Sequence, residues 1–326
     1  MDRVVLTDVT LREYGQNVPS SCLHVFTPKI RIEIGLELIR AGFRRIEVLS
    51  CVHSRVAPAM NREDVEEIAK GLGRAQDFEL VTLVPNKAGY GNFLAWGLGP
   101  DRYNHTLGFF FSAVEAHNRL NLGRSIQETM KEGEGIIEDA VARGTKVAGY
   151  VSAAFGYLDH ESGRLIRPPF ALLNKFIDFY FDLGVEMVTL SDLQGVADER
   201  ATAEAFQAVL AGRERSQAER IGYHPHHVIS AKAIANSRAA YEEGIRCFDA
   251  SLAGTGGCVT GAPGNQPVEL LVRAFEGRRI KTGIDEEAVA VLKEFVQKHL
   301  YSKITLPRPP LEKLQPVITV HPKSAC

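Results

Sequence analysis

Short apolar segments and longer amphipathic segments alternate along this chain. The short segments are rich in β-branched and aromatic residues, which is typical of buried strands. They lie at residues 3–11, 44–50, 78–84, 103–111, 146–154, 186–192, 220–229 and 246–253. Between them, apolar residues recur with the period of a helix at residues 29–42, 62–73, 125–144, 170–184 and 231–244. The pattern therefore predicts about eight strands separated by helices.

Several predicted helices end in glycine just before the next strand, at Gly42, Gly144, Gly184 and Gly244. Glycine commonly ends a helix because it adopts the left-handed conformation without a Cβ penalty. Strands that alternate with helices pair in parallel, and about eight such units match a (β/α)8 TIM barrel. A doubly wound open sheet is the alternative, but no glycine-rich dinucleotide motif follows the first strand. We therefore predict an α/β fold of the TIM-barrel type.

The pattern changes after Gly277. Residues 285–300 predict one more amphipathic helix, and residues 306–326 are rich in proline, which predicts an extended tail. We place the catalytic barrel domain at residues 1–278. The extra helix and the tail, packed on the barrel or extending from it, occupy residues 279–326.

The composition narrows the class of protein. The chain has 326 residues, 45% of them hydrophobic, and its 38 basic and 40 acidic side chains leave a net charge of -2. We expect neither nucleic acid nor a membrane as a partner, because this balance creates no attracting field and no apolar run approaches the ~20 residues of a membrane span.

The first residues lack a long apolar run, so we expect no signal peptide. Five scattered cysteines predict a reduced, cytoplasmic protein, and a homodimer or higher homo-oligomer is the default assembly.

Polar side chains follow the predicted strands at the end where barrel enzymes carry their chemistry. The candidates are Asp8, Arg12, Glu13, Gln16, Glu47, Asp192, His224, His226, His227, Cys258 and Asn265. Taken singly, each has an ordinary structural interpretation, such as a hydrogen-bonded histidine, an acid paired with arginine or a small buried cysteine. Taken together, a carboxylate, two imidazoles and an amide oxygen suit Mg²⁺ or Mn²⁺, and the lack of a thiolate cluster argues against structural zinc.

The stretch YHPHHVI holds three histidines in four positions. One imidazole is easily accommodated by packing, but an H-x-H pair at this end of a strand favours a metal site. Alternate residues of a strand point to the same side. His224 and His226 can therefore reach one cation together, while His227 faces away.

These segments together resemble the DRE-TIM metallolyases, a family with a (β/α)8 barrel. The family motif D-x-T-L-R-D/E-x-x-Q reads DVTLREYGQ here, from Asp8 to Gln16. Within the family the likeness is to the 3-hydroxy-3-methylglutaryl-CoA (HMG-CoA) lyases, and it runs through residues 3–277. It is carried further by RRIEVLSCVHSRVAPAM, LVPNKAGY, VEAHNRLNLGRSIQE, YVSAAFG, LSDLQGVA and the glycine-rich GTGGCVTGAPGN.

The resemblance implies a divalent-metal-dependent carbon–carbon lyase. Such an enzyme cleaves HMG-CoA, or a related 3-hydroxyacyl-CoA, into acetyl-CoA and a 3-oxo acid by a retro-Claisen reaction. A related hydroxy acid is the other substrate class that we consider. The implied metal ligands are Glu13, His224, His226 and Asn265. Among the implied catalytic residues, Arg12 stabilises the enolate and Cys258 takes part in proton transfer. The acids Glu47 and Asp192 are implied to lie near the reacting centre. Candidate contacts of the CoA thioester are Gln16, Lys29 and Arg124, and Lys87 is a further candidate for its phosphates.

The chain departs from the family pattern at three places. Glu13 stands where the family usually has a metal-binding aspartate. The run HPHHVISAKAIAN is one residue longer than usual, so counting back from Asn236 makes His227 a competitor of His226 for the second histidine position. Only seven positions separate Cys258 from Asn265, which predicts a shorter loop.

Two other functions remain open at the level of sequence. A condensing synthase of the isopropylmalate or citramalate type uses the same enolate in the opposite direction, but the cysteine-bearing loop favours a lyase. A barrel that has lost catalysis and serves as a binding protein is the alternative from another class.

Overall fold

The computed structural model describes residues 3–159, 162–256 and 263–303. Among these residues, eight parallel strands close into a barrel in the order β1-β10-β9-β8-β5-β4-β3-β2. They are β1 (Val5–Asp8), β2 (Arg45–Ser50), β3 (Glu79–Leu83), β4 (Thr106–Ser112), β5 (Val147–Ser152), β8 (Met187–Asp192), β9 (Ile221–Pro225) and β10 (Cys247–Ala250). A two-stranded antiparallel sheet, β6 (Tyr157–Leu158) and β7 (Leu165–Ile166), stands apart from the barrel. The predicted TIM barrel is confirmed.

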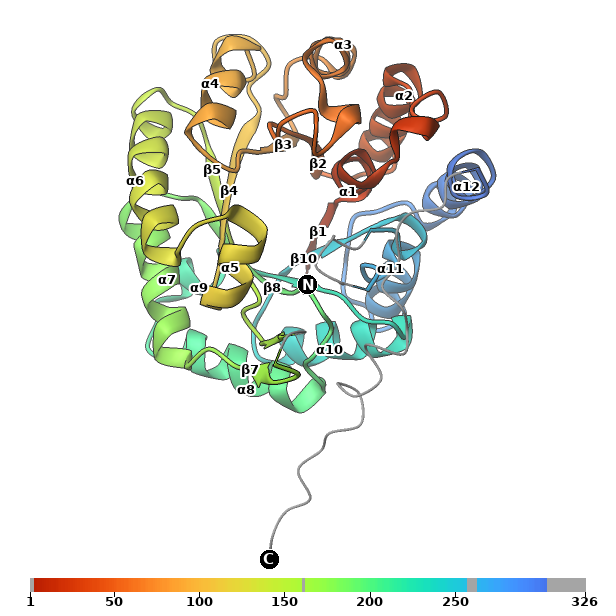
Figure 1. The fold of residues 1–326 in the computed structure, drawn as a ribbon. Helices are drawn as coiled ribbons and strands as arrows, with labels where there is room; N and C mark the ends of the chain where they lie inside the picture. Colours follow the sequence, from red (N-terminus) through yellow and green to blue (C-terminus); the bar gives the residue numbers. More distant parts are fainter. Residues whose placement is uncertain (1–2, 160–161, 257–262, 304–326) are drawn as a thin grey trace, which may run out of the picture.

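Helices surround the barrel (Figure 1). They are α1 (Thr10–Asn17), α2 (Pro28–Arg40), α3 (Arg62–Leu72), α4 (Lys87–Ala95), α5 (Glu115–Leu122), α6 (Ile126–Ala142), α7 (Phe170–Asp182), α8 (Glu199–Leu210), α9 (Arg215–Ala218), α10 (Ser230–Glu242), α11 (Val268–Glu276) and α12 (Glu286–Val296). Short 3-10 turns occur at η1 (Ser20–Cys22), η2 (Pro58–Met60) and η3 (Leu252–Gly254), and a π turn, η4 (Gln297–Tyr301), continues α12.

Local sequence signals explain where the helices begin and end. The Thr27 side chain caps α2 by accepting the Ile30 N–H at 3.4 Å, and Pro28 occupies the first turn, where its missing N–H costs nothing. Ser125 and Glu128 form a reciprocal capping box at the start of α6. The four glycines predicted to end helices all have positive φ, between 77° and 118°.

The first strand is shorter than the apolar pattern predicts. It ends at Asp8 rather than Leu11, and α1 already begins at Thr10. Asp8 Oδ1 accepts the Thr10 N–H at 2.9 Å, and Thr10 Oγ1 donates to Asp8 Oδ2 at 3.0 Å. This side-chain turn offers the backbone an alternative to further strand hydrogen bonds. Arg12 and Glu13 consequently lie on a helix above the barrel rather than on an extended strand.

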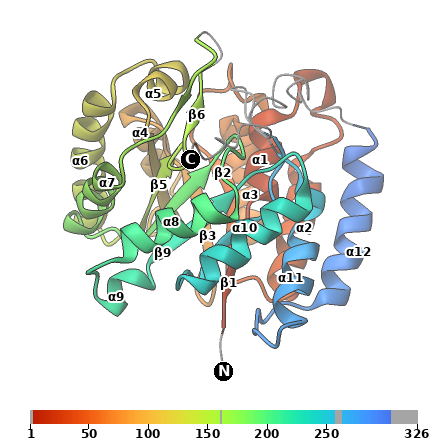
Figure 2. The same cartoon turned by 90° about the horizontal axis from the view of Figure 1, so that it is seen from below.

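The helix predicted at residues 285–300 is observed as α12, and η4 extends it. It packs outside the ring beside α2 and α11 (Figure 2), and it buries Val289 and Val296. The predicted proline-rich tail at 306–326 lies outside the described residues.

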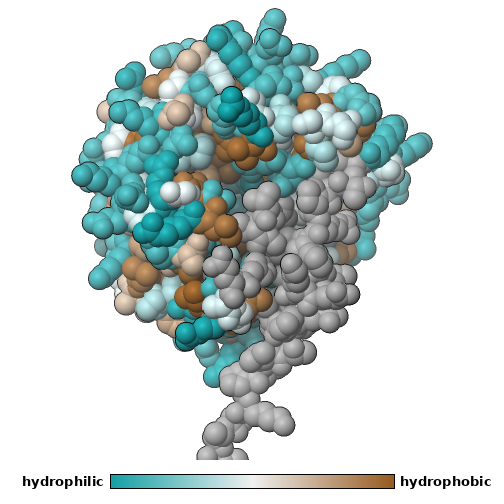
Figure 3. All heavy atoms as spheres, in the orientation of Figure 1, coloured by the Kyte–Doolittle hydropathy of each residue, from teal (hydrophilic) through white to brown (hydrophobic). Residues whose placement is uncertain are grey.

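Within the described ranges, no helix is long and apolar enough to cross a membrane. The described surface in Figure 3 is mostly hydrophilic, with apolar side chains in small groups.

Two glycines of α6 form a matched pair for testing the packing of the helix on the barrel. A Cβ at Gly133 would overlap the ring of Phe109, which is fully buried on β4, whereas a Cβ at Gly135 would meet nothing within 4 Å. Gly133→Ala should lower the free energy of unfolding by about 1–3 kcal/mol through overpacking. Gly135→Ala should raise it by about 0.5–1 kcal/mol, because alanine loses less backbone entropy in a helix. Urea denaturation measures both; equal effects would show that Gly133 is not held against Phe109.

Candidate active site

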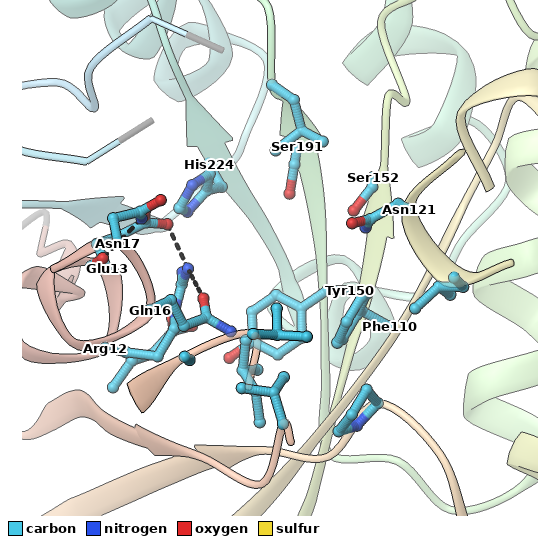
Figure 4. A pocket seen from close by; sticks show the side chains of 18 of the residues that line it. Arg12, Glu13, Gln16, Asn17, Phe110, Asn121, Tyr150, Ser152, Ser191 and His224 are labelled. Carbon is cyan, nitrogen blue, oxygen red and sulfur yellow. Dashed lines mark hydrogen bonds and ion pairs between the residues drawn. The ribbon is translucent and has the colours of Figure 1, made fainter. Parts of the chain in front are cut away.

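A cavity of about 350 Å³ opens where the C-terminal ends of the strands converge. On one side stand Glu13 and Arg12 from α1, facing His224 from β9 (Figure 4). Across the cavity lie Ser191, Ser152 and Asn121, the last from α5 (Figure 4). Leu83, Phe110 and Leu193 add apolar wall. The cavity therefore has a charged end and an opposite end that is lined by neutral polar and apolar side chains.

Glu13, His224 and His226 meet at the charged end. One potential ligand atom from each side chain lies within 4.8 Å of the other two, and all three residues are buried. Glu13 comes from α1, His224 from β9, and His226 from the segment that directly follows β9. The fold therefore brings together side chains that lie more than two hundred positions apart in the sequence.

The hydrogen bonds of the two histidines define their tautomers. His224 Nδ1 donates to Asp249 Oδ2 at 3.0 Å, and His226 Nδ1 donates to the Pro263 carbonyl at 2.7 Å. Because carboxylates and carbonyls only accept, these bonds place the protons on Nδ1. The two Nε2 atoms then direct lone pairs at one another across 2.8 Å. Such a pair needs a proton or a cation between or beside the nitrogens.

Burial, together with neighbouring His224, lowers the pKa of His226 to about 3. The imidazole of His226 is consequently neutral near pH 7, which is the form that binds metals. Adjacent ligands of one ion with metal–nitrogen bonds of about 2.1 Å lie about 3 Å apart. The observed separation of 2.8 Å between the Nε2 atoms is close to this value.

Asn265 supplies an unpaired oxygen next to this cluster. Its backbone forms a bridge with His226, and its Nδ2 donates to the Thr255 carbonyl at 2.8 Å. Its Oδ1 is buried and, among the described residues, has no hydrogen-bond partner. The backbone of Gly256 lies against both the Asn265 amide and the Glu13 carboxylate, since a Cβ there would crowd both groups. An orphaned carbonyl oxygen is costly in a protein interior unless a ligand takes it up, so the residues present fit a divalent cation.

Arg12 connects the acids of the cavity. Its Nε donates to Glu47 Oε2 at 2.8 Å, one Nη1 hydrogen bond goes to Glu13, and another reaches Gln16 Oε1 at 3.2 Å. Burial alone would raise the pKa of Glu13, but Arg12 and then the two histidines outweigh it, and the net shift is downward. Glu13 is therefore ionised, and Arg12 is the cation that faces it.

Asp192 has contacts of a different kind. Its two carboxylate oxygens accept the N–H groups of Val196 and Ala197, each at 3.0 Å, and it is not among the residues that line the cavity. Burial raises the pKa of Asp192 to about 6, against the lowering effect of these hydrogen bonds. The observed contacts hold the turn after β8, and a catalytic role for Asp192 stays a prediction.

The remaining predicted residues divide into two groups. Gln16 and Arg124 line the cavity, with Arg124 paired to Glu132. Lys29 and Lys87 are absent from the described lining. His227 Nδ1 accepts the Ile229 N–H at 2.9 Å and takes no part in the three-residue cluster. Cys258 lies outside the described residues.

Asp249 is a site residue that the sequence reasoning missed. It is buried on β10, and it orients the His224 ring. A signal was present, because Asp249 is an acid within the apolar segment RCFDASLA, and acids are rarely buried without a partner. Ser152 and Ser191 also line the cavity and were not predicted, although both lie close to the ends of predicted strands.

Residues 3–296 match the protein family described as HMGL-like. The chain belongs to the HMGL-like family. Because this match spans nearly the whole described chain, the resemblance to the DRE-TIM metallolyases inferred from the motifs is confirmed.

This HMGL-like chain is 31% identical over 277 residues to the cytoplasmic 3-hydroxy-3-methylglutaryl-CoA lyase of Danio rerio, which covers 84% of this chain and 78% of the relative. It is 30% identical over 317 residues to the (R)-citramalyl-CoA lyase of Chloroflexus aurantiacus, and the aligned region covers 92% of this chain and 92% of the relative. The crystal structure of the Bacillus subtilis HMG-CoA lyase superposes with a TM-score of 0.80 at 28% identity, covering 98% of this chain and 99% of that one. An HMG-CoA lyase from Acinetobacter baumannii in complex with coenzyme A and 3-methylmalate has a TM-score of 0.79 at 26% identity, covering 100% and 97%.

The two neighbouring histidines can be separated by mutation. His226→Ala removes a nitrogen of the cluster and should weaken Mn²⁺ binding by more than the 10–100-fold typical of losing an outer-sphere partner. His227→Ala is the matched control and should leave Mn²⁺ affinity within about twofold of the parent. Titration of each purified protein with Mn²⁺, followed by electron paramagnetic resonance, measures the dissociation constants. The reverse ranking would assign the second histidine position to His227.

Asp249→Asn tests the orientation of His224. The amide keeps the shape of the carboxylate but loses its charge, so Mn²⁺ affinity should fall about 10–100-fold. The control is Asp178→Asn, which breaks a surface ion pair with Arg213. The same Mn²⁺ titration, combined with thermal unfolding, distinguishes lost ligand orientation from lost stability. Unchanged affinity in Asp249→Asn would contradict the role.

Proposed function

We propose that this protein is a divalent-metal-dependent carbon–carbon lyase that cleaves HMG-CoA or a related 3-hydroxyacyl-CoA to acetyl-CoA and a 3-oxo acid. The observation that carries the proposal is the convergence of Glu13, His224 and His226 beside Oδ1 of Asn265, which has no hydrogen-bond partner among the described residues. Mg²⁺ or Mn²⁺ is the ion that this set of a carboxylate, two imidazoles and an amide oxygen suits. When bound, such an ion polarises the substrate hydroxyl and orients the substrate.

The reaction sets definite tasks for the chain. The hydroxyl loses its proton, the bond between C2 and C3 breaks, the electron pair becomes the enolate of acetyl-CoA, and a proton then adds to the enolate carbon. The protein must therefore supply a base, a positive group for the enolate oxygen and an acid.

Arg12 is proposed to stabilise the enolate. Its guanidinium is fixed by Glu13 and Glu47 before substrate arrives. A charge that is already in place needs no reorganisation as the negative charge develops. Arginine suits this task because it stays protonated throughout.

Glu47 is proposed as the group that accepts the hydroxyl proton. Its Oε2 takes both bonds from Arg12, whereas Oε1 is buried in the cavity wall with no hydrogen-bond partner among the described residues. Glu47 is among the residues that line the cavity, so its carboxylate lies beside the space proposed for substrate. Cys258 is proposed as the proton donor to the enolate carbon, from the family likeness alone.

The related proteins support the substrate class. One relative is named as a citramalyl-CoA lyase and others as HMG-CoA lyases, and one similar structure holds coenzyme A with 3-methylmalate. Arg124 at the cavity is the proposed contact for CoA phosphates, and Gln16 for the thioester end. A cytoplasmic location and a homo-oligomeric state stay predictions.

A substrate screen with one active-site variant tests the function. Purified protein with Mg²⁺ or Mn²⁺ should release acetyl-CoA from HMG-CoA with a 3-oxo acid as the second product, measured by liquid chromatography. Cleavage of citramalyl-CoA instead, which gives a 2-oxo acid, would move the substrate assignment to that thioester. Glu47→Gln should lower kcat by about 10²–10⁴-fold, the range for a general base, with Mn²⁺ affinity retained. Glu79→Gln, at the start of β3 and paired with Arg45, is the control and should turn over like the parent. Formation of free thiol from acetyl-CoA and 2-oxo acids, without any cleavage, would favour a synthase instead.

A further inference from the structure

The C-terminal helix reaches the active-site end of the barrel. The π turn η4 closes with a hydrogen bond from Ser302 N to the Gln297 carbonyl at 3.0 Å. At its end, the Tyr301 ring stacks on Tyr14 with the centroids 4.9 Å apart and the planes at 9°. Tyr14 directly follows Glu13 on α1 and is almost fully buried. The last described turn of the chain is therefore packed against the helix that carries a candidate ligand.

The Tyr301 hydroxyl holds the start of the glycine loop, which is defined here as residues 252–256. It donates to the Leu252 carbonyl at 2.7 Å. The N–H of Leu252 donates to Thr10 Oγ1 at 2.9 Å. Leu252 is thus held on both sides, by α1 through its N–H and by the C-terminal helix through its carbonyl.

A second contact joins α12 to the same loop. Ala253 has a φ of 54°, a left-handed conformation that costs a non-glycine residue free energy. Its N–H donates to Glu269 Oε2 at 3.1 Å, and Glu269 Oε1 pairs with Lys293 Nζ of α12 at 3.8 Å. The strained turn is consequently supported from the C-terminal helix at two points.

The glycine loop in turn orients the metal-facing groups. The Thr255 carbonyl accepts both the Asn265 amide at 2.8 Å and Ser251 Oγ at 2.7 Å. The bond to Asn265 Nδ2 turns the unpaired Oδ1 away from the loop. Gly256, with a φ of 111°, lies directly against the Asn265 amide and the Glu13 carboxylate. A shift of the loop would therefore move one proposed ligand and crowd another.

We infer that Tyr301 is a positioning residue, which holds the glycine loop so that Asn265 and Glu13 keep the geometry that binds the divalent ion. This inference rests on the proposed metal-dependent function. It makes the C-terminal helix part of the active-site architecture, although no side chain of that helix lines the described cavity.

The test compares two tyrosines in the full-length protein. Tyr301→Phe keeps the ring stack and removes the hydrogen bond to Leu252, and it should weaken Mn²⁺ binding about tenfold, as loss of an outer-sphere partner does. Tyr90→Phe removes a hydrogen bond of equal length, 2.7 Å, from Tyr90 to Asp139 between α4 and α6, and should leave Mn²⁺ affinity unchanged. Electron paramagnetic resonance titration without substrate gives the affinities, and thermal unfolding gives the stability.

Lys293→Met is a second variant, which removes the other contact from a partly exposed position. It should weaken Mn²⁺ binding in the same direction with little change in the unfolding temperature. In both variants kcat/KM measured at low Mn²⁺ should fall and should recover at saturating Mn²⁺. Parent-like Mn²⁺ affinity in Tyr301→Phe would overturn the inference and leave the proposed function standing, whatever the result for Lys293→Met. A parent protein that binds no Mn²⁺ would overturn both.

Discussion

The pairing of β1 with β10 closes the barrel, and the site depends on that closure. The register runs from Val5 beside Cys247 to Asp8 beside Ala250. It places the first turn of α1 against the start of the glycine loop, where Thr10 binds the Leu252 N–H. Because β9 is the next neighbour of β10, the same closure brings the glutamate of α1 to the histidines that end β9. An open sheet with β1 and β10 at its edges would separate these groups.

The charges of the buried ionisable groups are the second feature on which the site depends. Glu13, Glu47 and Arg12 are all buried, and a buried ion without a partner is costly. One guanidinium between two carboxylates leaves a net negative charge, next to two imidazoles whose lone pairs face each other. Glu47 Oε1 and Asn265 Oδ1 are buried and have no hydrogen-bond partner among the residues that the structure describes, which supports the same conclusion. The cluster is therefore electrostatically incomplete by itself, which is a property expected of a site that binds a cation and a substrate.

The supports of the site are mostly uncharged and lie behind the side chains that face the cavity. Asp249 holds one imidazole, the Pro263 carbonyl holds the other, and the Thr255 carbonyl holds the Asn265 amide. Asp249 lies on β10, whereas Thr255 and Pro263 belong to the connection between β10 and α11. Orientation by such outer partners is how a protein keeps ligands at a usable geometry.

The sequence by itself determined the barrel, because strand and helix periods, glycine helix ends and motif spacing are local signals that each segment carries alone. It also predicted Glu13, His224, His226 and Asn265 as a set, through alternation along one strand and through family likeness. Only the tertiary structure decided that α1 begins at Thr10, that Asp192 serves the turn after β8, and that Asp249 and Tyr301 stand behind the site. The contacts of Asp249 and Tyr301 join residues 25 and 49 positions apart, and no local pattern encodes which side chains meet once a closed barrel has brought the strand ends together.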